Sequence, residues 1–109
     1  MARVRIRELS PSEARSVLAD DDREIDVVDL RDAGAFAAGH IVAARLVPAA
    51  VLSGDPGVIG REREVLLYDG GEGIASRAAS FLARLGYADC FVLQGGFPAW
   101  LAEDLPVEP

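Results

Sequence analysis

The sequence predicts an α/β protein in which a parallel β-sheet has helices on both faces. Residues 25–30 and 65–68 form nearly continuous apolar runs, typical of strands buried on both sides. Segments with helical spacing of apolar residues alternate with such strands. Short connections between alternating strands and helices favour a parallel arrangement. At 109 residues, half of them apolar, the chain is expected to form one domain over residues 1–109.

The N-terminal half predicts short elements with clear boundaries. Residues 4–6 suggest a strand exposed on one side, and Ser10, Pro11 and Glu13 form a capping box that starts a helix ending near Ala19. A short helix around Phe36 follows, capped by Asp32 and closed by Gly39. The remaining expectations are a strand over 45–47, one helical turn over 49–53 and a loop over 54–57.

The C-terminal half predicts two more strands and two helices. After the strand over 65–68, one helix face is formed by Ile74, Ala78, Phe81, Leu82 and Leu85. Gly86 stands where a helix commonly ends. A strand over 91–93 and a final short helix with Phe97, Trp100 and Leu101, spaced to pack on the core, complete the pattern.

Composition excludes several classes of function. Eleven basic against 18 acidic residues give a net charge of −7, which disfavours nucleic acids and anionic membranes as partners. No apolar run approaches the ~20 residues of a membrane span, and no signal peptide is visible. One cysteine and one histidine allow no internal disulfide and make a metal site improbable. We expect a cytoplasmic protein without metal or cofactor; its oligomeric state is open.

The segment from Asp69 to Gly73 is the first place to expect a ligand. It directly follows a buried strand, and parallel sheets bind ligands outside the carboxyl ends of their strands. Gly70, Gly71 and Gly73 allow a tight turn that aims N–H groups inward, next to a helix N-terminus. The spacing fits neither a nucleotide P-loop nor a dinucleotide fingerprint.

Several ordered segments together resemble rhodanese domains. The first signature corresponds to Asp29-Leu30-Arg31 with Phe36 and Gly39-His40-Ile41; the others are Val65-Leu66-Leu67-Tyr68, Ser76-Arg77-Ala78-Ala79, Gly86-Tyr87, Val92-Leu93-Gln94-Gly95-Gly96, Trp100 and Leu105-Pro106. The resemblance covers nearly the whole chain. It implies a three-layer sandwich around a five-stranded parallel sheet, and the sulfurtransferase family.

The same resemblance implies that the catalytic position has changed. Active rhodanese domains carry sulfur as a persulfide on a cysteine directly after the strand, where this chain has Asp69. The arginine that helps bind the anionic donor corresponds to Ile74, and the serine of the loop to Ala75. Ala43 replaces a usual glycine. The loop resembles most the non-catalytic first domain of two-domain thiosulfate sulfurtransferases, which also carries aspartate there.

These changes lead to a hypothesis for the loop formed by Asp69, Gly70, Gly71, Glu72, Gly73, Ile74 and Ala75. The Asp69 carboxylate is expected to accept hydrogen bonds from N–H groups of the loop and so to fill the anion cradle. A carboxylate cannot hold a persulfide, so classical sulfur transfer at this position is excluded. The domain would then act as a binding or regulatory module, with Glu72 solvated and Arg77 pairing with Glu72 or Asp69.

Other interpretations stay open. Cys90 is the only possible sulfur carrier of a divergent sulfurtransferase, although a buried structural cysteine is the simpler reading. The domain could instead act with a catalytic sulfurtransferase on another chain. His40 and Ser76 could contribute to a hydrolase, but the motif around a serine nucleophile is absent. By the resemblance, Asp29, Arg31 and His40 have structural roles.

Overall fold

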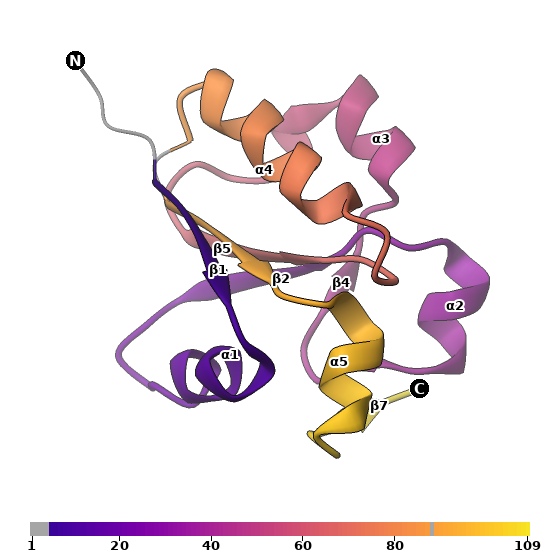
Figure 1. Cartoon of the computed structure of the whole chain (residues 1–109). Coiled ribbons are helices and arrows are strands. Elements are labelled where there is room, and N and C mark those ends of the chain that lie inside the picture. Colours follow the sequence, from indigo (N-terminus) through magenta and orange to yellow (C-terminus); the bar gives the residue numbers. More distant parts are fainter. Residues whose placement is uncertain (1–4, 88) are drawn as a thin grey trace.

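A computed structural model describes residues 5–87 and 89–109. The elements follow one another as β1 Arg5–Leu9, α1 Pro11–Leu18, β2 Ile25–Asp29, α2 Ala33–Ala38, β3 His40–Ile41, β4 Arg45–Leu46, α3 Ala49–Gly54, the 3₁₀-helix η1 Pro56–Val58, β5 Glu64–Tyr68, α4 Ile74–Arg84, β6 Asp89–Leu93, α5 Gly96–Ala102 and β7 Val107–Glu108. Figure 1 shows the sheet between two layers of helices.

The main sheet has five strands in the order β1-β6-β5-β2-β4, and every neighbouring pair is parallel. This confirms the predicted fold class. The central strand β5 pairs with β2 from Glu64 opposite Ile25 to Tyr68 opposite Asp29. The carboxyl end of β5 therefore opens in the middle of the sheet edge, where ligands of such folds bind.

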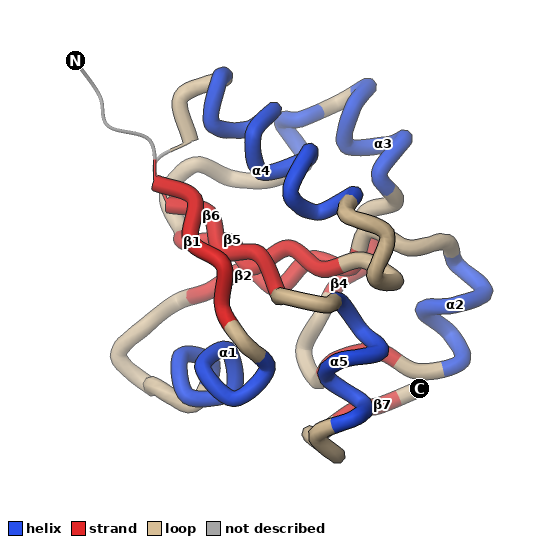
Figure 2. The backbone as a smooth tube through the Cα atoms, viewed as in Figure 1, coloured by secondary structure: helices blue, strands red, loops and turns tan. Residues whose placement is uncertain are grey.

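The strands divide the core between the two faces of the sheet. In β5, Val65 and Leu67 pack against α3 and α4, whereas Leu66 and Tyr68 pack on the opposite side with α1 and α5. The side-chain period of a strand, which is two residues, produces this alternation. Figure 2 shows the helices α3 and α4 on one side of the strands and α1 and α5 on the other. Buried strands covered on both faces explain the continuous apolar runs of the sequence.

The helix boundaries follow the capping signals. Ser10 accepts a hydrogen bond from the N–H of Glu13, and the Glu13 carboxylate accepts one from the N–H of Ser10. Asp32 accepts one from the N–H of Ala35. These bonds satisfy backbone donors that a helix cannot satisfy internally, so the predicted starts of α1 and α2 are confirmed.

Three features depart from the prediction. Residues 54–57 were expected to be a loop, but α3 extends to Gly54 and Pro56–Val58 form a 3₁₀-helix. The strands β3 and β7 were not predicted, and they pair antiparallel as a separate two-stranded sheet. The first strand continues to Leu9, beyond the predicted end; Val4 lies outside the described residues. In the described part of the chain, no helix is long and apolar enough to cross a bilayer.

Candidate functional site

The loop between β5 and α4 is organised around the side chain of Asp69. This carboxylate is 4% exposed. Its Oδ1 accepts a hydrogen bond from the N–H of Gly71 at 2.8 Å, and its Oδ2 accepts one from the N–H of Ala75 at 2.8 Å. The predicted contact between this carboxylate and the loop amides is therefore present in the structure.

Asp69 also supplies the missing cap of α4. The residue at the N-cap position is Gly73, which has a left-handed φ of 87° and no side chain to accept a bond. The N–H of Ala75 lies in the first turn and needs an acceptor. The Asp69 carboxylate provides it and places a negative charge at the positive end of the helix dipole, where anions are stabilised.

The turn between β6 and α5 closes over the same carboxylate. The N–H of Phe97 donates to the backbone oxygen of Asp69 at 2.8 Å. A Cβ on Gly96 would lie 2.6 Å from Asp69 Oδ1, from Asp69 O and from the N of Gly71. Only glycine allows such an approach, and Gly96 also has a φ of 66°. The two strand-end loops therefore pack as one unit.

A cavity of about 150 Å³ opens beside this unit. Its charged and polar side chains come from Glu8, Asp69, Ser76 and Gln94, and within residues 5–87 and 89–109 no lysine, arginine or histidine lines it. The two carboxylates make the potential of this cavity unfavourable for an anion. The glycines alone predict a site that favours anions, whereas the carboxylates that line this cavity disfavour them.

The other residues of the loop have separate surroundings. Ile74 is half-buried against the core and lines a groove between α3 and α4 with Leu52 and Phe81. Glu72 is exposed, as expected. Arg77 is exposed too, and among the described side chains no ion pair joins it to Glu72 or Asp69, so that prediction is wrong.

Asp29 and Arg31 form the expected ion pair at the end of β2. The buried Asp29 carboxylate accepts hydrogen bonds from the Nη2 of Arg31 at 2.7 Å and from its Nε at 3.0 Å. Arg31 also donates to the backbone oxygen of Gly39 and stacks over the Phe97 ring at 4.1 Å. Burial works against the charged guanidinium, but the bonds to Asp29 outweigh it and raise the Arg31 pKa. Burial also raises the pKa of Tyr68, whose hydroxyl oxygen accepts a bond from the N–H of Ile41.

His40 lies on β3 and has neighbours that fit a structural role. Its ring stacks on Phe36 at 3.7 Å, with Nδ1 2.9 Å from the Phe36 backbone oxygen. Its Nε2 lies 3.5 Å from Glu108 Oε1, on the paired strand β7. Ser76, by contrast, lines the cavity beside Asp69, and no hydrogen bond joins it to His40 among the described residues. The structure does not bring these two side chains together as a catalytic pair.

Cys90 lies at the opposite end of the sheet from the loop. It pairs with Val65 on β5, and Asp69 follows Val65 by four residues, roughly 13 Å along a strand. The thiol is 1% exposed, and burial, with a smaller contribution from Asp89, raises its pKa to about 11. A protonated, inaccessible thiol is a poor nucleophile.

Two site features were missed by sequence reasoning. Glu8 and Gln94 line the cavity because β1 and β6 are neighbours in the sheet, which no local pattern indicates. The close approach of Gly96 to Asp69 was also missed. The Gly95-Gly96 pair predicts a turn at this point but not which residue the turn contacts. Over the described residues, no cluster of three or more histidines, cysteines or acidic residues could hold a metal ion.

The five-stranded parallel sheet with helices on both faces defines an α/β sandwich domain, whose glycine-rich loop follows the central strand at the sheet end where ligands of open α/β sheets commonly bind. Residues 10–103 match the rhodanese-like domain, and the chain belongs to this family.

Similar proteins support this assignment. The thiosulfate sulfurtransferase GlpE of Pseudomonas putida (strain GB-1) is 40% identical over 78 residues, which are 70% of this chain and 69% of that protein. YibN of Escherichia coli K12, named as uncharacterized, is 28% identical over 106 residues, 94% of this chain and 73% of that protein. A rhodanese-related protein from Thermoplasma volcanium shares the fold with a TM-score of 0.83 at 20% identity, over 94% of this chain and 97% of that one.

Proposed function

We propose that this rhodanese-like domain is a binding or regulatory module in which Asp69 stands where active members carry the persulfide cysteine. The observation behind the proposal is the pair of hydrogen bonds from Gly71 and Ala75 to the Asp69 carboxylate. A persulfide needs a sulfur atom at the end of the strand, and a carboxylate supplies none. The same bonds use loop amides that would otherwise face a substrate anion.

The charge of the cavity supports the same conclusion. Thiosulfate is a dianion, and the cavity presents the carboxylates of Glu8 and Asp69 to it. Ile74, at the position that resembles the donor-binding arginine, contacts the apolar groove between α3 and α4. A donor anion would therefore meet repulsion from both carboxylates, and no described residue that lines the cavity is a cation. Arg77 lies outside this lining, although its Nη1 would be 4.0 Å from a Cβ on Gly73.

The alternative is a divergent sulfurtransferase that uses Cys90. Transfer of sulfane sulfur requires the thiolate to attack the donor. Burial of this thiol and its raised pKa of about 11 both oppose that step. Cys90 is therefore the weaker candidate, and its substitution gives a direct control.

A catalytic sulfurtransferase on another chain is the partner we propose for this module. The loop resembles the non-catalytic first domain of two-domain thiosulfate sulfurtransferases, where a catalytic domain accompanies it. The name of the relative GlpE supports sulfur transfer as the process in which this family member takes part. Affinity purification of the tagged chain from its native cells, followed by mass spectrometry, tests this. Repeated absence of any sulfurtransferase would contradict the proposed partner.

Turnover of thiosulfate tests the proposed lack of activity. The purified chain is incubated with thiosulfate and cyanide, thiocyanate is measured, and P. putida GlpE provides the positive control. We expect a rate equal to that of the Cys90→Ser variant and of buffer. A higher rate that Cys90→Ser abolishes would support the alternative. A higher rate that survives this substitution would also overturn the proposal, because it would place the activity elsewhere in the chain.

A further inference from the structure

A second cavity lies apart from the Asp69 loop. Residues of α1, β2, β3 and α5, with the segment before β7, enclose a groove of about 240 Å³. Its lining side chains are apolar except for two arginines, Arg15 and Arg23. Ligand sites of proteins commonly combine an apolar lining with a few charged or polar groups.

The floor of the groove is formed by buried residues of the core. Val27, Ile41 and Trp100 line it and are all buried. The indole N–H of Trp100 donates to the backbone oxygen of Pro106 at 3.0 Å, so this donor is already used. At the rim, Val42 remains 43% exposed. The groove therefore offers exposed apolar contact area, which favours an apolar ligand group.

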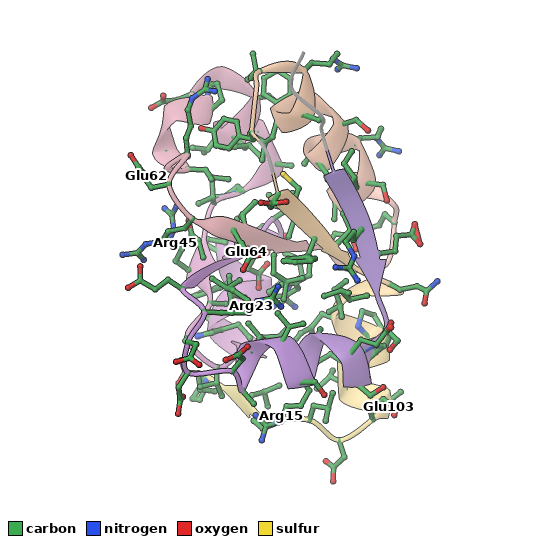
Figure 3. The ribbon with its side chains drawn as sticks, turned by 90° about the vertical axis from the view of Figure 1, so that its left-hand side faces the viewer. Arg15, Arg23, Arg45, Glu62, Glu64 and Glu103 are labelled. Atoms are coloured by element: carbon green, nitrogen blue, oxygen red, sulfur yellow. The ribbon has the colours of Figure 1, made fainter. Side chains whose placement is uncertain are left out.

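The charge of the groove is opposite to that of the whole chain. The protein has a net charge of −7, yet none of the described residues that line this groove is acidic. Figure 3 shows Arg23 between α1 and the sheet, and Arg15 on α1. Arg15 is exposed. Arg23 pairs with Glu64 through two of its nitrogens: Nε lies 3.3 Å from Glu64 Oε1, and Nη2 donates to Glu64 Oε2 at 3.4 Å. Its side chain is 35% exposed, and among the described residues no hydrogen bond uses its Nη1, which leaves those N–H groups for a ligand. A guanidinium group binds a carboxylate with charge-assisted hydrogen bonds.

We propose that this groove binds a small amphipathic monocarboxylate, with its apolar chain on Val27, Ile41 and Trp100 and its carboxylate at the arginines. The volume lies below the roughly 300–1,000 Å³ of sites for drug-sized ligands, which fits one short chain rather than a large cofactor. Charge complementarity selects a carboxylate over an amine of equal length. The site is independent of the Asp69 loop.

Octanoate serves as the probe, and the protein supplies its own reporter. Trp100 is the single tryptophan of the chain and lines the groove, so its fluorescence reports on occupation. Titration of the whole chain with octanoate should give a saturable change. Octan-1-ol has the same apolar length without the charge. It should bind at least about tenfold more weakly than octanoate, because it makes no charge-assisted hydrogen bond.

Matched arginine variants locate the carboxylate. Arg15→Gln and Arg23→Gln should each weaken octanoate binding by about tenfold, whereas Arg84→Gln removes the same charge from the exposed end of α4 and should leave the dissociation constant unchanged. Because Arg23 also contacts Glu64, a circular-dichroism melt must first show that this variant folds. If Arg23→Gln does not fold, the Arg15→Gln variant still tests whether an arginine of the groove binds the carboxylate.

A variant that fills the groove completes the test. Val17 lines the groove and is half-buried, and Val17→Phe should abolish the fluorescence change in a chain that still melts cooperatively. If Val17→Phe does not fold, the arginine variants and octan-1-ol still decide the question. An unsaturable response of the unmodified chain, or equal octanoate affinity of the Arg15, Arg23 and Arg84 variants, would overturn the proposal.

Discussion

The Oδ2 atom of Asp69 accepts a hydrogen bond from the backbone N–H of Ala75 at 2.8 Å. This bond joins the end of the central strand β5 to the first turn of α4. The residue between them at the N-cap, Gly73, has no side chain for this purpose. Asp69 thus has a structural role in this loop, at the position where, by the resemblance to rhodanese domains, we propose that active members carry the nucleophile.

Removal of this carboxylate should destabilise the domain. In Asp69→Ala, the amides of Gly71 and Ala75 lose their acceptors within a mostly buried site. We expect a loss of about 1–3 kcal/mol in the free energy of unfolding, measured by urea titration. Glu72→Ala, which removes an exposed carboxylate from the same loop, should change it by less than about 0.5 kcal/mol. Equal effects of the two substitutions would contradict the structural role of Asp69.

The contact between the two strand-end loops predicts a strong effect at Gly96. A Cβ there would lie 2.6 Å from Asp69 and Gly71 atoms, and the φ of 66° is unfavourable for alanine. Gly96→Ala should therefore cost at least about 2 kcal/mol of unfolding free energy. At Gly54, a Cβ meets nothing within 4 Å, so Gly54→Ala should be neutral or stabilise by up to about 1 kcal/mol. Similar melting temperatures for both variants would refute the close packing.

Ala43 offers a substitution that should stabilise the chain. It has a φ of 71°, in the left-handed region that is unfavourable for residues with a Cβ. The resemblance to rhodanese domains gives glycine as the usual residue there. We expect Ala43→Gly to raise the unfolding free energy by about 1 kcal/mol, visible as a higher melting temperature. A lower melting temperature would show that the left-handed backbone costs less than the flexibility of glycine.

The sequence predicts most of this fold because its signals are local. Apolar runs identify β2 and β5, and the capping box identifies α1. The strands β3 and β7 were missed because their antiparallel pairing joins segments far apart in the sequence, and because two residues each carry no pattern of their own. The equally short β4 was predicted from Arg45 to Val47, where Pro48 marks its end. The same reason applies to the site. Asp69 directly follows a recognisable strand, whereas Glu8 and Gly96 reach it only through the order of the strands.

A cysteine introduced at position 69 should not by itself give sulfurtransferase activity. In Asp69→Cys, the thiol would face a cavity that still contains Glu8 and, among its described lining residues, no cation, and Ile74 still occupies the position that resembles the donor-binding arginine. We expect thiocyanate formation below about a hundredth of the GlpE rate, since one missing charge-stabilising group commonly costs 10²–10³-fold. The double variant Asp69→Cys/Ile74→Arg should be faster than the single one. High activity of Asp69→Cys alone would show that the arginine position matters less than we propose.

The buried thiol of Cys90 makes a prediction about pH. Its pKa is raised from 9.0 to about 11, so the folded state retains the proton more strongly than the unfolded state. The resulting stability is present below pH 9 and is lost as the pH rises towards 11. Urea titrations across this interval should show a larger decline for the unmodified chain than for Cys90→Ala. Parallel declines would contradict the raised pKa.

The most direct test of the central claim is the intact mass of the protein after incubation with thiosulfate. We expect the unmodified chain to gain no sulfur, because a carboxylate at Asp69 cannot hold one and Cys90 is buried and protonated. P. putida GlpE, named as a thiosulfate sulfurtransferase, is treated in parallel as the positive control. A gain of one sulfur atom that cyanide removes would contradict the account.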